Sequence, residues 1–205
     1  MSLTDQIDLS RQHSMVGMDI PWMLQEWANR TPDKTSMIWC PFEGEAQQWS
    51  YLELQRDALK IAAGLHDRGI KAGDFVFLHM DNSPEFVVSW YACGLLGAVA
   101  VSTNTHSVAR DMAYFAEVSD AVCAITQPKF AELIKNSCPQ LSFIAVTDND
   151  AGEPRADQDE IIQKIAGLAF DELKSTTALP ILDCDPKRNL SVQFTSGTTS
   201  RPKAV

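Results

Sequence analysis

The residues with the clearest potential for chemistry form one short polar segment, residues 195–203, which directly follows an expected strand at residues 190–194. In order, it contains Thr195, Ser196, Gly197, Thr198, Thr199, Ser200, Arg201, Pro202 and Lys203. A glycine lets the backbone approach a ligand closely, and hydroxyls and backbone N–H groups donate hydrogen bonds to phosphate oxygens. Lys203 adds a positive charge, and Pro202 stiffens the backbone that leads to it. The segment therefore predicts a phosphate-binding loop.

Two other interpretations of this segment are a nucleotide-binding P-loop and a turn that binds nothing. The P-loop needs Gly-Lys followed by a magnesium-binding Ser or Thr. Here Pro202 precedes the lysine and Ala204 follows it, so the P-loop is excluded. A Ser/Thr-rich turn would explain an isolated Ser-Gly-Thr. The length and order of the whole string after a strand favour phosphate binding instead.

The other polar residues favour structural roles. We expect His66 near the end of a helix and His79 at the end of a strand, where both are interpreted as structural or surface residues. His106 is expected in a loop and has no partner in the adjacent sequence. The acidic stretch of residues 148–159 lacks the glycine-centred spacing of a calcium loop and is expected to be a solvated loop. We therefore predict no catalytic residue and no metal ligand within the chain.

The composition of the 205 residues is typical of a water-soluble globular protein, with 45% hydrophobic and 21% charged residues. A formal net charge of −10 without any Lys/Arg block argues against a nucleic-acid partner. The longest apolar stretch, residues 86–101, is interrupted by Ser89, Gly94 and Gly97, so no membrane span is predicted. The five cysteines include no Cys-x-x-Cys pair, and residues 1–14 carry no apolar signal core. A reduced, cytoplasmic location is therefore expected.

The elements that must position the loop alternate between strand and helix. Helices are expected over residues 21–30, 50–68, 83–97, 108–115, 128–136 and 160–170, and strands over residues 37–40, 47–49, 75–78, 98–101, 121–126, 143–146 and 190–194. Ser50 and Glu53 have the spacing of a capping box, and Ser83 with Pro84 is a typical helix start. This alternation predicts an α/β fold with a largely parallel sheet. In such sheets ligands bind beyond the carboxyl ends of the strands, which is where the polar segment follows its strand.

The string Thr-Ser-Gly-Thr-Thr-x-x-Pro-Lys resembles the phosphate loop of the adenylate-forming, or AMP-binding, superfamily. Its members include acyl-CoA synthetases, peptide-synthetase adenylation domains and firefly-type luciferases. Upstream, residues 69–74, 82–86 and 96–98 look like the N-terminal region of the same superfamily in the same order. Ser200–Arg201 and the run of residues 78–86 are most similar to crotonobetaine/carnitine-type CoA ligases. Ser200 and Ala204 depart from the glycines that many members have at these positions.

The resemblance implies that the chain is the N-terminal part of the large domain of an acid–CoA ligase. Its substrates would be ATP, a small-molecule carboxylic acid and CoA, with Mg²⁺ as the metal cofactor. ATP phosphates would be held by Thr195, Ser196, Gly197, Thr198, Thr199 and Lys203. A homodimer is compatible with the resemblance. A module that loads a carrier protein and a non-catalytic nucleotide-binding or scaffold protein remain alternatives.

The resemblance also implies a division of the chain. We expect residues 1–20 to be a disordered or tag-like N-terminus and residues 21–205 to be part of the large adenylation domain, ending just after the phosphate loop. The remainder of the large domain and the C-terminal domain would lie beyond Val205. These 205 residues alone are therefore expected to lack ligase activity, and the carboxylic acid substrate stays open.

Overall fold

The computed structural model of the chain describes residues 16–42, 44–195 and 202–205. Its helices are α1 (Ile20–Arg30), α2 (Tyr51–Asp67), α3 (Pro84–Leu96), α4 (Ala109–Ser119), α5 (Pro128–Ser137), α6 (Gln158–Ile165) and the 3₁₀ helix η3 (Phe170–Leu173). Its strands are β1 (Thr35–Trp39), β2 (Gln47–Ser50), β3 (Phe75–His79), β4 (Val99–Ser102), β5 (Cys123–Thr126), β6 (Ile144–Val146), β7 (Asn149–Asp150), β8 (Glu153–Pro154), β9 (Leu168–Ala169), β10 (Ser191–Thr195) and β11 (Lys203–Ala204). Within this part of the chain no helix is both long and apolar enough to cross a lipid bilayer.

Seven strands form the central sheet in the order β11-β10-β4-β3-β5-β6-β9. All neighbouring pairs are parallel except β10 and β11, which are antiparallel. The predicted α/β class with a largely parallel sheet is therefore confirmed. Two short hairpins, β1–β2 and β7–β8, stand apart from this sheet.

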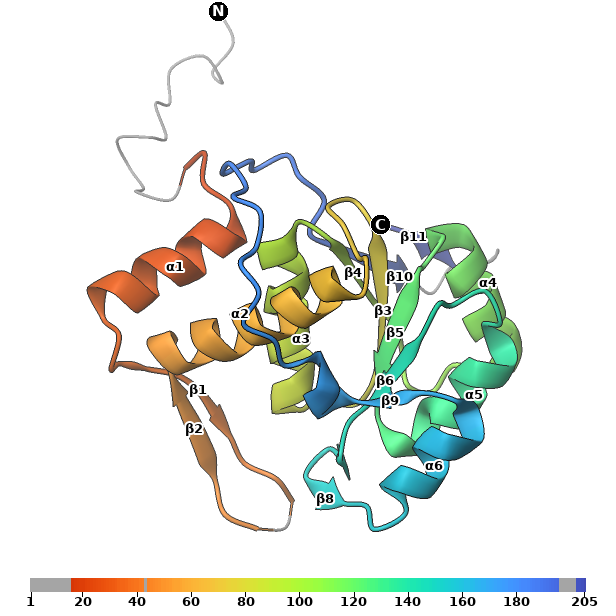
Figure 1. Cartoon of the computed structure of the whole chain (residues 1–205). Helices are drawn as coiled ribbons and strands as arrows, with labels where there is room; N and C mark the ends of the chain where they lie inside the picture. The colour runs from red at the N-terminus through yellow and green to blue at the C-terminus, as the bar shows by residue number, and fades with distance from the viewer. Residues whose placement is uncertain (1–15, 43, 196–201) are drawn as a thin grey trace, which may run out of the picture.

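Helices cover both faces of the sheet and make two hydrophobic cores (Figure 1). Alternate residues of β3 point to opposite faces: Val76 and Leu78 belong to the core under α1, α2 and α3, whereas Phe77 belongs to the core under α4, α5 and α6. These three side chains have no exposed surface. A strand buried on both faces is apolar along most of its length, which explains the continuous apolar run that predicted it.

The predicted helix starts are confirmed at α2 and α3. The Ser50 hydroxyl accepts a hydrogen bond from the Glu53 N–H, and the Glu53 carboxylate accepts one from the Ser50 N–H. Ser83 caps α3 by accepting from the Phe86 N–H. Helix α3 ends at Gly97, whose φ of 78° is favourable only for a residue without a Cβ.

Three sequence predictions need correction. Residues 148–159 are not simply an exposed loop: they contain the β7–β8 hairpin and the start of α6, and Asp150 is only 7% exposed. The helix expected over residues 160–170 ends at Ile165, because the chain turns there and residues 168–169 pair with β6 as strand β9. Asp19 and Ile20 were assigned to a disordered N-terminus, yet they are the cap and first residue of α1. Residues 1–15 lie outside the described residues.

Candidate functional site

Two of the predicted phosphate-binding residues, Thr195 and Lys203, lie within the described residues, at the carboxyl end of β10 and the start of β11. Strand β11 returns antiparallel to β10, and this pairing sets Thr195 directly opposite Lys203. The Thr195 hydroxyl lies 3.5 Å from the Lys203 carbonyl oxygen. Both residues are exposed, so both are accessible to a ligand. The other predicted phosphate-binding residues, Ser196, Gly197, Thr198 and Thr199, lie outside the described residues.

Strand β10 pairs with β4, which brings the loop after β4 to the same edge of the sheet. That loop is held to β3 by His79, whose Nδ1 lies 2.8 Å from the Thr103 hydroxyl oxygen. Thr126, the last residue of β5, donates its hydroxyl to the His79 carbonyl at 2.6 Å. Hydrogen bonds thus join the ends of three strands, and they help to fix the position of the loop next to β10.

The His79 ring is fully buried against Phe130, with the ring centroids 4.7 Å apart. Burial lowers the pKa of His79 from 6.5 to about 4, and the charge of Asp81 opposes that effect. The ring is therefore neutral at neutral pH. The structural role expected for His79 agrees with this placement.

Asp81 follows β3 at the same edge and is fixed by two residues at the start of α5. Lys129 Nζ lies 2.5 Å from its carboxylate, and the Gln127 side chain accepts from the Asp81 N–H at 3.0 Å. Partial burial acts to raise the pKa of Asp81, but hydrogen bonds from Lys129 and Thr105 outweigh it and lower the pKa. The carboxylate therefore stays ionised. The sequence did not single out these two partners, although Gln127 directly follows a predicted strand and Lys129 begins the next predicted helix.

A groove of about 610 Å³ opens beside this edge. Its walls come from the β1–β2 hairpin, the start of α3 and the loop after β4. Trp39 and Phe86 supply apolar surface, and Asp81, Asn104 and His106 supply polar groups. A groove of this size with mixed walls suits a small organic molecule. His106, for which the sequence offered no partner, belongs to this wall.

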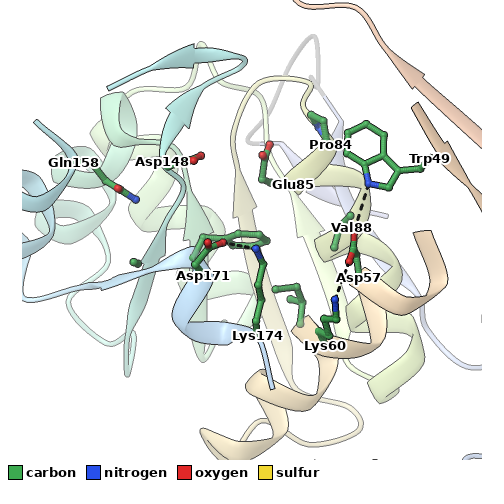
Figure 2. Close-up of a pocket in the computed structure, with 13 residues that line it drawn as sticks. Trp49, Asp57, Lys60, Pro84, Glu85, Val88, Asp148, Gln158, Asp171 and Lys174 are labelled. Atoms are coloured by element: carbon green, nitrogen blue, oxygen red, sulfur yellow. Dashed lines mark hydrogen bonds and ion pairs between the residues drawn. The ribbon is translucent and has the colours of Figure 1, made fainter. Parts of the chain in front are cut away.

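A second cavity, of about 340 Å³, lies among α2, α3 and η3 (Figure 2). It is close to β6 and β9, at the far end of the strand order from β10. Its two lysines already pair with neighbouring aspartates: Lys60 with Asp57 at 3.4 Å, and Lys174 with Asp171 at 2.7 Å. Strands β4, β3 and β5 separate β6 on this side from β10. Because its lysine charges are neutralised by their own neighbours, this cavity is a poorer anion site than the loop at Lys203.

No group of three or more His, Cys, Asp or Glu side chains suited to hold a metal occurs among the described residues. The arrangement at the edge of β10 can bind an anion through Lys203 and the hydroxyl of Thr195.

Comparison with known proteins gives consistent matches. A family profile described as AMP-binding enzyme matches residues 24–205. The crotonobetaine/carnitine–CoA ligase of Salmonella paratyphi A is 30% identical over 193 residues, which are 92% of this chain and 36% of that protein. The inhibitor-bound N-terminal domain of FACL13 from Mycobacterium tuberculosis superimposes with a TM-score of 0.70 at 26% identity, over 92% of this chain and 44% of that one. Acetoacetyl-CoA synthetase from Streptomyces lividans, at 22% identity, shares the fold with a TM-score of 0.74 over 90% of this chain and 29% of its own. The chain thus spans about a third of the length of the curated relative, at 36%.

Proposed function

Because this chain belongs to the AMP-binding enzyme family, we propose that it is part of an AMP-forming acid–CoA ligase. The observation that carries the proposal is the β10–β11 pairing, which sets Thr195 opposite Lys203 at the carboxyl end of a parallel strand. The similarity to a CoA ligase over 92% of the chain supports the same activity.

The proposed reaction has two steps. A carboxylate oxygen of the substrate attacks the α-phosphorus of ATP, the bond from that phosphorus to the bridging oxygen breaks, and pyrophosphate leaves. The CoA thiolate then attacks the acyl carbon of the adenylate and AMP leaves. Both the carboxylate and the triphosphate are anionic, so the first step needs positive charge and hydrogen-bond donors near the phosphates. Mg²⁺, when bound with ATP, neutralises part of that charge.

In this proposal Lys203 and the Thr195 hydroxyl hold the β- and γ-phosphates, which become the leaving pyrophosphate. Ser196, Gly197, Thr198 and Thr199 contribute further donors to the same phosphates. A charge-assisted hydrogen bond contributes about 1.5–3 kcal/mol, and about 1.4 kcal/mol corresponds to a tenfold change in rate or affinity. Loss of Lys203 should therefore reduce the first step roughly 10- to 100-fold.

The testing experiment is acid-dependent ATP–pyrophosphate exchange by the whole encoded protein. The panel should contain betaine-like acids, since the relative's name specifies crotonobetaine and carnitine, together with short-chain, fatty and aromatic acids. Lys203→Ala should lower the exchange, whereas Lys174→Ala is the matched control because that lysine pairs with Asp171 in the distant cavity. The proposal would be contradicted if none of the acids supported exchange, or if both variants exchanged pyrophosphate equally.

Adding the acyl acceptor then identifies the second step. Release of AMP that requires CoA supports a ligase, whereas exchange without any CoA-dependent release favours a module that loads a carrier protein.

We further propose a cytoplasmic location. The support is that all five cysteines are free thiols, three of them buried.

A further inference from the structure

Helix α4 reaches across to the phosphate loop from a distant part of the sequence. The Phe115 ring stacks on Phe194 of β10, with centroids 4.1 Å apart and planes at 24°. One residue earlier, the Tyr114 hydroxyl donates a hydrogen bond to the Pro202 carbonyl oxygen at 3.0 Å. The two members of this bond are 88 residues apart in the chain. Helix α4 therefore contacts both the strand that enters the loop and the residue at its exit.

The Pro202 carbonyl is an effective point at which to control Lys203. Proline has no N–H, so this carbonyl is the only backbone hydrogen-bonding group of residue 202. The peptide between residues 202 and 203 is planar, so orienting its carbonyl also orients the Lys203 N–H on the opposite side. The Tyr114 hydroxyl thereby sets the direction in which the Lys203 backbone leaves the loop.

The chain beyond Lys203 is held independently. The Val205 N–H donates to the Gln193 carbonyl at 2.9 Å, and the Gln193 N–H donates to the Val205 carbonyl at 2.9 Å. Tyr114 thus acts on the loop side of Lys203, and the β10–β11 pairing acts on the other side. A lysine held at both ends of its backbone has fewer arrangements in which its side chain can miss the phosphates.

We propose that Tyr114 is a positioning residue for ATP, acting through the Pro202–Lys203 peptide at the exit of the phosphate loop. The inference rests on the proposed function, because ATP phosphates are the ligands assigned to Lys203. The ring and the hydroxyl of Tyr114 have separable roles. Its ring lies 6.4 Å from Phe194 and packs there, whereas its hydroxyl contacts Pro202.

Tyr114→Phe keeps the ring and removes the hydroxyl, so it tests the inference directly. Tyr91→Phe is the matched control, because Tyr91 is also half-buried but lies on α3, on the opposite face of the sheet. In the exchange assay on the whole protein, Tyr114→Phe should raise KM for ATP about three- to tenfold, the effect of one lost hydrogen bond, and change kcat less than about twofold. Tyr91→Phe should match the wild type. Equal KM values in the two variants would overturn the inference.

A double-mutant comparison separates positioning from a general structural effect. If Tyr114 acts through Lys203, Tyr114→Phe should change KM less than about 1.5-fold when Lys203→Ala is already present. The same factor in both backgrounds would show that the hydroxyl acts elsewhere, and the inference would be wrong.

Hydrogen–deuterium exchange distinguishes failure of this inference from failure of the proposed function. If none of the acids supports pyrophosphate exchange by the wild type, the proposed function fails. The amides of residues 203–205 still report on the contact between Tyr114 and Pro202. Faster amide exchange there in Tyr114→Phe than in Tyr91→Phe, with unchanged exchange in α5, supports the positioning role. Equal exchange in the two variants refutes it.

Discussion

The substitution Gly64→Ala distinguishes local from tertiary control of this fold. Gly64 lies in the interior of α2 and is buried. In a helix interior, alanine is more favourable than glycine by about 0.5–1 kcal/mol, so local propensity alone predicts stabilisation. The structure predicts the opposite. A Cβ at Gly64 would lie well under 3.0 Å from the Leu173 backbone, a separation that atoms do not adopt without movement.

The required movement is costly because η3 is held against α2. Leu173 has no exposed surface, and the Ser175 N–H donates to the Lys60 carbonyl at 3.1 Å just beyond η3. Overpacking of this kind costs about 1–3 kcal/mol. Exposing half of the Leu173 side chain would cost about 1 kcal/mol more, which roughly cancels the gain in helix propensity. We expect Gly64→Ala to lower the free energy of unfolding by about 1–3 kcal/mol.

Urea unfolding followed by tryptophan fluorescence measures this change, and Gly94→Ala is the control. Gly94 is also buried inside a helix, but its Cβ would meet the tip of the Leu190 side chain at 2.8 Å, which can rotate away. That variant should stay within about 1 kcal/mol of the wild type. If Gly64→Ala were as stable as the wild type or more stable, the close approach of η3 to α2 would not be a constraint, and the reasoning would be refuted.

Two further predictions concern buried ionisable side chains. His79 has a pKa lowered from 6.5 to about 4 by burial, so the unfolded chain binds more protons than the folded one between these values. Stability should be fully present above pH 6.5 and fall by on the order of 3 kcal/mol as the pH drops towards 4, at about 1.4 kcal/mol per pKa unit. Urea unfolding at several pH values should show a shallower fall in His79→Asn, and an unchanged slope would contradict the assignment. Asp150 accepts hydrogen bonds from the Lys129 N–H at 3.1 Å and from Arg155 at 2.5 Å while only 7% exposed. Asp150→Asn should lower the unfolding free energy by about 2 kcal/mol, against less than about 1 kcal/mol for Asp157→Asn, whose side chain is 45% exposed. Equal losses in thermal unfolding would show that burial at Asp150 is unimportant.

The sequence predicted those parts of the fold that depend on residues close together in the chain. The capping box of Ser50 and Glu53 joins residues three positions apart, and most strands were identified from short apolar runs. Prediction was wrong where distant pairing decides the outcome. Leu168 and Ala169 continue a helical pattern of apolar residues, yet they form β9 because Ala145 and Val146 of β6 offer a parallel edge. Asp150 was assigned to a solvated loop, although it is buried where it accepts from the N–H of Lys129 near the start of α5.

For the candidate site, the sequence by itself predicted which residues bind phosphate. The types and spacing of Thr195, Gly197, Pro202 and Lys203 indicate phosphate binding without reference to any other part of the chain. Tertiary structure decided what surrounds them. The order of the parallel strands brings β4 and helix α4 beside β10, and so places Tyr114 on Pro202 from 88 residues away. The physical reason is range: caps, turns and periodicity act over a few residues, whereas strand order and register depend on the burial of both faces of the whole sheet.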